Sequence, residues 1–124
     1  MGLALADQAR RRGARVTLLA ANVSASLPPG VEVVFTPTAS DLEREALRRA
    51  GADVILMAAA VGDYRAAAPV DGKRAKGGDN WQVELTPTTD IARALGERRT
   101  PTQVLVAFGA EHGAAGLERK RGML

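Results

Sequence analysis

An acidic side chain stands shortly after the most apolar run of the sequence. That run covers Asp53–Ala60, and Asp63 follows it within Val61-Gly62-Asp63-Tyr64-Arg65. A carboxylate at the carboxyl end of a buried strand can accept hydrogen bonds from ribose hydroxyls or a base, or help to hold a metal. A turn carboxylate that caps backbone N–H groups accounts for the same residue equally well. The sequence leaves both interpretations of Asp63 open.

A second polar turn joins an expected strand to an expected helix. It reads Leu85-Thr86-Pro87-Thr88-Thr89-Asp90-Ile91 and places two threonine hydroxyls beside a helix start. The first N–H groups of a helix lack partners within the helix and lie at the positive end of its dipole, so such a start can bind an anion. An ordinary N-cap at Thr88 or Thr89 is the simpler interpretation of this turn when it is considered alone.

Phe108 ends a third apolar run, within Ala107-Phe108-Gly109-Ala110-Glu111-His112-Gly113. Its ring can form one wall of a base-binding pocket or pack in the core. Glu111 can bind a metal or cap a helix. His112 is more typical of a solvated loop than of a catalytic site.

Two of the three lysines of the chain fall in one long polar loop, as Lys73 and Lys76. Point cations on a mobile loop suit a triphosphate that arrives, reacts and leaves. A solvated charge cluster is the alternative interpretation.

Strands alternate with helices along the whole sequence, which predicts parallel βαβ units. We expect an α/β fold, a Rossmann-like doubly wound and mainly parallel sheet with helices on both faces. Such a domain usually opens with a strand and a phosphate-binding turn, whereas this sequence opens in a helical pattern. We therefore expect residues 1–124 to be one partial domain whose leading strand is missing. The expected helices are 2–13, 41–50, 88–99 and 116–124, and Ser40 or Thr38 can cap the second of them. The expected strands are 15–20, 31–35, 53–60, 81–85 and 102–109, and residues 62–80 are expected to form a loop.

Composition excludes several classes of function. The chain has 124 residues, no cysteine and one histidine, which excludes disulfides, thiolate chemistry and a multi-histidine metal site. No apolar run is long enough for a membrane span, and no signal peptide is visible, so we expect a cytoplasmic protein without a membrane partner. The net charge of +3 comes from basic residues scattered among acidic ones, so we expect no nucleic-acid partner.

Taken in order, these segments resemble the phosphopantothenoylcysteine synthetase family of coenzyme A biosynthesis. The most specific match is Ala58-Ala59-Ala60-Val61-Gly62-Asp63-Tyr64-Arg65, which is similar to the family pattern A-A-V-[AS]-D-[FY]-R. Further matches are Lys73-Arg74-Ala75-Lys76 to K-x-K-K, Thr88-Thr89-Asp90-Ile91 to [TN]-P-D-I, and Val106-Ala107-Phe108-Gly109-Ala110-Glu111 to G-F-A-A-E. The likeness covers essentially the whole chain.

The resemblance implies a CTP-dependent ligation of 4′-phosphopantothenate with L-cysteine through an acyl-cytidylate. Mg²⁺ is expected to accompany CTP, and no metal ligand is assigned within the chain. The resemblance places Asp63 at the cytidine and Phe108 along its pocket. Lys73 is then the catalytic residue and closes over the phosphates. The helix start that faces the nucleotide is formed by Thr88, Thr89, Asp90 and Ile91.

The same resemblance implies a homodimer and a fused decarboxylase half, and FMN is expected only in that half. The sequence departs from the family pattern at Ala75 and Thr89, and Met123 stands where a family lysine belongs, with Lys120 nearby. A segment with G-G-T and N-x-S-S-G-K is expected before residue 1, so turnover by this chain alone is not expected. Two alternatives remain: another nucleotide-binding Rossmann-like module, and a noncatalytic remnant that only associates with a partner.

Overall fold

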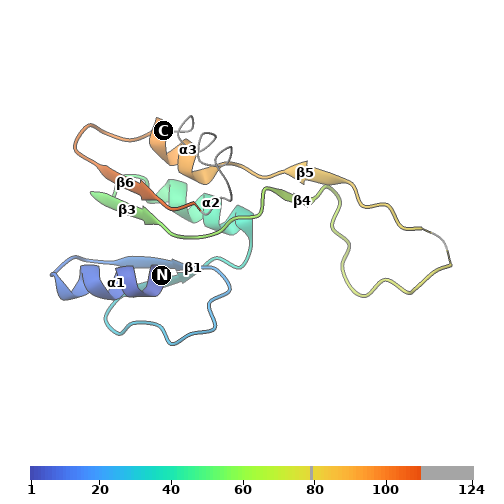
Figure 1. Ribbon diagram of the computed structural model, residues 1–124, viewed down its shortest axis with the longest axis horizontal. Coiled ribbons are helices and arrows are strands. Elements are labelled where there is room, and N and C mark those ends of the chain that lie inside the picture. The colour runs from blue at the N-terminus through green and yellow to red at the C-terminus, as the bar shows by residue number, and fades with distance from the viewer. Residues whose placement is uncertain (79, 110–124) are drawn as a thin grey trace.

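The computed structural model describes residues 1–78 and 80–109 (Figure 1). Helices and strands alternate along much of the chain, as the sequence predicts. The expected helix at 116–124 lies outside the described residues, as do Glu111, His112, Lys120 and Met123. The elements are α1 (Gly2–Arg11), β1 (Thr17–Ala20), β2 (Glu32–Phe35), α2 (Ala39–Arg48), β3 (Val54–Met57), β4 (Tyr64–Ala66), β5 (Leu85–Pro87), α3 (Ile91–Glu97) and β6 (Val104–Ala107).

The strands form three two-stranded sheets instead of the one doubly wound sheet expected. β1 pairs with β2 and β3 pairs with β6, both in parallel, while β4 pairs with β5 in antiparallel orientation. Within the described residues no strand joins β1 to β3. The expectation of mainly parallel pairing is confirmed, and that of a continuous sheet is not. Side-chain packing, and not a backbone ladder, therefore connects the two parallel pairs.

A small apolar core provides that packing. Leu42 of α2 and Ile91 and Leu95 of α3 form its buried centre. Leu19 of β1 packs against this centre, as do residues of the other parallel pair: Ile55 and Met57 of β3 and Leu105 of β6. Because α2 and α3 touch strands of both parallel pairs, they fix the strands' carboxyl ends relative to each other.

The other face of the β3–β6 pair is largely uncovered in the described part of the chain. Successive strand residues point to opposite faces of a sheet. The residues that alternate with Ile55, Met57 and Leu105 are therefore on the opposite face, and they are exposed: Val54, Leu56, Val104 and Val106. Helices on both faces, which the sequence predicts, are thus not found for this pair within residues 1–78 and 80–109.

The start of α2 is fixed by a reciprocal cap. The hydroxyl of Thr38 accepts a hydrogen bond from the backbone N–H of Asp41 at 3.1 Å, and the Asp41 carboxylate accepts one from the backbone N–H of Thr38 at 3.3 Å. This capping box supplies partners to N–H groups that the helix leaves unpaired. The hydroxyl of Thr38 and the guanidinium of Arg44 both donate to the Asp41 carboxylate and hold its pKa below the ordinary value of 3.8.

The segment between β3 and α3 differs most from the sequence-based expectation. The predicted loop 62–80 contains β4, and the predicted strand 81–85 is replaced by β5 at Leu85–Pro87. Trp81, Val83 and Leu85 alternate with polar residues in this stretch, but all three side chains are exposed. Alternation favours a strand only where one face is buried, and nothing covers these residues in the described structure. Figure 1 shows the chain between β4 and β5 extending away from the helices.

No helix in the described ranges has the length and apolarity required to cross a bilayer.

Truncation of the core is expected to destabilise the fold strongly. Leu95 is 2% exposed, so Leu95→Ala removes buried methyl groups and leaves a cavity, and we expect the free energy of unfolding to fall by about 2–5 kcal/mol. Leu85 is 57% exposed, and Leu85→Ala is the matched control, with an expected change within about 0.5 kcal/mol. Urea denaturation followed by circular dichroism measures both. Equal losses in the two variants would contradict the packing described.

The cap of α2 predicts a defined pH dependence. The pKa of Asp41 is lower in the folded chain than in the unfolded one, so its stabilisation is fully present above the unfolded pKa. It is lost as the pH falls through the lowered pKa. In urea denaturation between pH 2 and 6, Asp41→Asn should lose less stability than the wild type on acidification. Parallel curves for the two proteins would show that Asp41 does not titrate differently on folding.

Candidate functional site

An open pocket of about 170 Å³ lies beyond the carboxyl ends of β1, β2 and β3, beside the start of α2. Ligands of open α/β folds bind beyond the carboxyl ends of the strands, so this is the expected position for a site. The sequence analysis identified Val61 and Gly62 at this edge but missed the contributions of the β1 and β2 loops. The lining residues are Ala21, Asn22, Thr36, Pro37, Thr38, Ala39, Leu42, Ala59, Ala60, Val61 and Gly62.

The structure ties the Asp63 loop to the Thr88 turn. The backbone N–H of Thr88 donates to the carbonyl oxygen of Asp63 at 2.9 Å, and the Thr88 hydroxyl donates to the carbonyl oxygen of Gly62 at 2.5 Å. No hydrogen bond to the Asp63 carboxylate is found within the described residues, and the residue is exposed. Within the residues described, Asp63 is therefore not seen to cap its own turn, and it is an exposed residue at the junction of the two loops.

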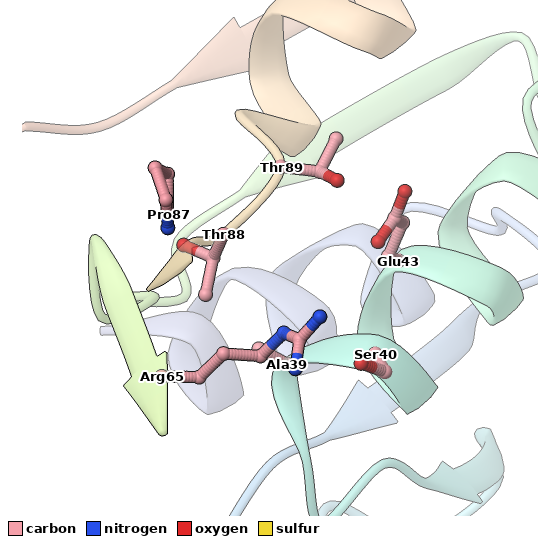
Figure 2. Close-up of a pocket in the computed structure, with 7 residues that line it drawn as sticks. All are labelled: Ala39, Ser40, Glu43, Arg65, Pro87, Thr88 and Thr89. Carbon is pink, nitrogen blue, oxygen red and sulfur yellow. The ribbon is translucent and has the colours of Figure 1, made fainter. Parts of the chain in front are cut away.

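The Thr88 turn meets the first turn of α2 at a second, smaller pocket of about 90 Å³. Figure 2 shows the side chain of Arg65 extending from β4 toward Ala39 and Ser40, with Thr88 and Thr89 above them. Glu43 of α2 also lines this pocket. The sequence analysis assigned no role to Arg65 or Glu43, because nothing in the sequence shows that β4 brings Arg65 back to α2.

Asp90 and Ile91 have structural partners of their own. The carboxylate of Asp90 accepts a hydrogen bond from the backbone N–H of Arg93 at 3.0 Å and is the N-cap of α3. The expectation that Thr88 or Thr89 caps this helix is wrong, since the helix begins at Ile91. The side chain of Ile91 lies in the core. Both side chains are thus engaged within the protein, Asp90 at the helix start and Ile91 in the core.

Phe108 and Lys73 are placed very differently. The backbone N–H of Phe108 donates to the carbonyl oxygen of Met57 at 3.2 Å, so Phe108 lies at the carboxyl edge where β3 ends. Its side chain is 42% exposed, which leaves part of the ring available to a ligand. Lys73 is exposed in the segment between β4 and β5, and no contact in the described structure brings it to the other candidates. Within the described part of this segment, Arg74 stacks over Trp81 at 4.8 Å from the ring centroid, and the backbone N–H of Ala67 donates to the carbonyl oxygen of Glu84 at 3.0 Å.

Comparison with known proteins gives consistent matches. Residues 1–121 match the family model described as the DNA/pantothenate metabolism flavoprotein C-terminal domain. The coenzyme A biosynthesis bifunctional protein CoaBC of Bacillus subtilis is 37% identical over 113 residues, which cover 90% of this chain and 28% of that protein. A cysteine/cysteine sulfinic acid decarboxylase from an unknown prokaryotic organism is 36% identical over 117 residues, covering 90% of this chain and 32% of its own length.

A solved structure agrees with the sequence matches. The crystal structure of the C-terminal domain of CoaBC superimposes with a TM-score of 0.79 at 28% identity, and the match covers 98% of this chain and 57% of that one. The chain thus spans less than a third of the length of these two curated relatives and somewhat over half of the solved domain.

The tie between the two loops can be tested without a ligand. Thr88→Val removes the hydroxyl that donates to Gly62, and we expect the free energy of unfolding to fall by about 0.5–1.5 kcal/mol. Thr89→Val, one residue along and without such a bond in the described structure, should change it by less than about 0.5 kcal/mol. Urea titration distinguishes the variants. If Thr88→Val is as stable as Thr89→Val, the hydroxyl does not hold the loops together.

Proposed function

Because this chain belongs to the family of the DNA/pantothenate metabolism flavoprotein C-terminal domain and is homologous to the CoaBC synthetase domain, we propose that it is part of a CTP-dependent phosphopantothenate–cysteine ligase. The observation that carries the proposal is the junction of the Asp63 loop with the Thr88 turn at the strands' carboxyl edge, where Phe108 also lies. An exposed carboxylate, threonine hydroxyls and part of an aromatic ring are groups that can recognise a nucleoside.

In the proposed reaction a carboxylate oxygen of 4′-phosphopantothenate attacks the α-phosphate of CTP and diphosphate leaves. The amino group of L-cysteine then attacks the acyl carbon, an amide forms and CMP leaves. A free carboxylate is a poor electrophile, and the nucleotide phosphate converts its oxygen into a good leaving group. Such chemistry depends mainly on positioning and on stabilisation of phosphate charge.

The candidate residues have distinct roles in this proposal. Asp63 accepts hydrogen bonds from the cytidine, and Phe108 packs against it. Thr88 and Thr89 lie beside the phosphates, and Arg65 adds a positive charge to the pocket that these threonines line. Asp90 and Ile91 act indirectly, because one caps α3 and the other anchors it in the core.

Lys73 requires a movement of the chain to fulfil its role. It lies in the extended segment between β4 and β5, where all described residues from 67 to 84 are exposed. We propose that this segment folds back when the triphosphate binds and brings the Lys73 ammonium to the phosphates.

Mg²⁺ enters the proposal as part of the nucleotide substrate. Mg²⁺ commonly binds through phosphate oxygens and a few protein ligands and keeps several waters. In residues 1–78 and 80–109 no three acidic, histidine or cysteine side chains gather into a metal site. The proposal assigns FMN only to a fused decarboxylase half, and the bifunctional relatives are consistent with such a fusion.

Association is the second candidate function. The exposed apolar face of the β3–β6 pair and the exposed Trp81 and Val83 are surfaces that another chain can cover. We propose a homodimer on this ground, in agreement with the family resemblance.

Ligand-dependent melting tests the proposed function. CTP with Mg²⁺ is expected to raise the melting temperature of the chain, because a ligand that binds only the folded state stabilises it. NAD is the control for a dehydrogenase-like module and should give no shift. A higher melting temperature with NAD alone would contradict the ligase proposal and indicate a dehydrogenase-like module. An unchanged melting temperature with both ligands would favour association as the function.

Lys73→Gln is expected to weaken binding of CTP with Mg²⁺ by roughly tenfold, the effect of losing about 1.4 kcal/mol of phosphate attraction. Lys76→Gln removes an equal charge three residues away and is the matched control, with an expected change below about threefold. Isothermal titration calorimetry measures both affinities. If both variants bind CTP equally weakly, Lys73 contributes only general positive charge and has no specific role at the phosphates.

A further inference from the structure

A carboxylate and a guanidinium line the smaller pocket, of about 90 Å³, between the first turn of α2 and the Thr88 turn. Glu43 comes from α2 and Arg65 from β4, as Figure 2 shows. Within residues 1–78 and 80–109 neither side chain has a hydrogen bond or an ion pair. Arg65 is exposed and Glu43 is half-buried, so a molecule from solvent can reach both charges.

Glu43 differs in this respect from the other acidic residues of α2. Asp41 pairs with Arg44 at 2.8 Å, and Glu45 pairs with Arg48 at 3.0 Å. Residues three and four positions apart are neighbours on a helix surface, and those around Glu43 carry no charge. They are Ala39, Ser40, Ala46 and Leu47. The helix therefore supplies no cation to the Glu43 carboxylate, which is left to the pocket.

Three hydroxyl groups complete the polar lining. They belong to Ser40, Thr88 and Thr89. The Thr88 hydroxyl donates its proton to Gly62 and can still accept a hydrogen bond. The side chains of Ser40 and Thr89 have no hydrogen bond in the described part of the chain. The pocket thus combines two opposite charges with several free hydrogen-bonding groups.

This combination selects the charge of a ligand. A phosphate near Arg65 would be repelled by Glu43, and a simple cation near Glu43 would be repelled by Arg65. A zwitterion avoids both conflicts, because a guanidinium binds a carboxylate through paired hydrogen bonds and an ammonium group donates three hydrogen bonds. An α-amino acid carries both groups on one carbon atom.

The size of the pocket agrees with a small ligand. Its volume of about 90 Å³ is well below the range of about 300–1,000 Å³ found for complete drug-sized ligand sites. A nucleotide or a whole 4′-phosphopantothenate molecule would not fit inside it. L-cysteine is the smallest of the three substrates of the proposed reaction.

We propose that this pocket binds the zwitterionic amino-acid substrate, with Arg65 at its carboxylate and Glu43 at its ammonium group. The inference rests on the proposed function, which identifies the amino acid as L-cysteine. Thr88 also belongs to the turn that the proposed function places beside the nucleotide. An amino acid held in the pocket would therefore lie next to the activated carboxylate that its amino group must attack.

Three ligands separate the contributions of the two charges. L-cysteine carries both groups, cysteamine lacks the carboxylate, and 3-mercaptopropionate lacks the ammonium group. Their affinities are measured at pH 7 by amide chemical-shift titration, with and without CTP and Mg²⁺, for the wild type, Arg65→Gln and Glu43→Gln. Arg99→Gln removes an exposed arginine outside the pocket lining and is the matched control. Circular dichroism verifies that each variant is folded.

The wild type should bind L-cysteine at least about tenfold more tightly than either analogue, because each analogue leaves one charge without its partner. Arg65→Gln should weaken L-cysteine binding at least about tenfold and change cysteamine binding less than about threefold. Glu43→Gln should weaken L-cysteine binding as strongly and leave 3-mercaptopropionate binding unchanged or tighter. Arg99→Gln should bind all three ligands as the wild type does.

Two results would overturn the proposal. One is a wild type that binds no L-cysteine, whether or not CTP is present. The other is an Arg65→Gln variant that binds L-cysteine normally and CTP more weakly, which would assign Arg65 to the phosphates. Failure of the proposed function gives a different pattern, in which the wild type does not bind CTP. If L-cysteine still binds with the expected dependence on Arg65 and Glu43, the amino-acid site stands without the ligase reaction.

Discussion

The packing of α2 and α3 against strands of two separate sheets determines the rest of the structure. β1 and β3 share no backbone hydrogen bonds in the described residues, and Leu19 and Ile55 both pack against the cluster of Leu42, Ile91 and Leu95. Packing of this kind is non-directional and depends on the area removed from water. The site at the strands' carboxyl ends therefore depends on a small number of apolar contacts.

Directional bonds add the precision that this packing lacks. Thr88 bonds to both Gly62 and Asp63 and joins the loop after β3 to the turn before α3. At the opposite end, the buried side-chain amide of Gln103 donates to the carbonyl oxygens of Ala50 and Ala52, which joins the start of β6 to the chain that enters β3. Hydrogen bonds thus fix the chain at both ends of the β3–β6 pair. The segment between β4 and β5 extends outward, and its described residues are exposed.

Local patterns predicted the helices and the four parallel strands well. The alternation of apolar runs with capped helices identified them, and of the two expected caps of α2, Ser40 or Thr38, the structure has Thr38. The sheet arrangement was not predictable in this way, because a run such as Asp53–Ala60 indicates burial and not which edge it pairs with. β4 was missed since Tyr64-Arg65-Ala66 has no apolar alternation, and its pairing with β5 is long-range.

The site could be predicted only in part for the same reason. Asp63 and Thr88 were recognisable because each stands at a strand end, and the structure brings their loops together. Arg65 becomes a candidate only through neighbours distant in sequence. The side chain of Ile91 lies in the core, and the part that the helix start at Ile91 plays in nucleotide binding stays a prediction.

Mapping CTP binding by amide chemical shifts would test the account most directly. On titration with CTP and Mg²⁺, the largest shifts are predicted at the amides of Asp63, Thr88 and Phe108, with those of α1 unchanged. Shifts confined to α1 or to the exposed face of the β3–β6 pair would contradict the assignment of the nucleotide site to this edge.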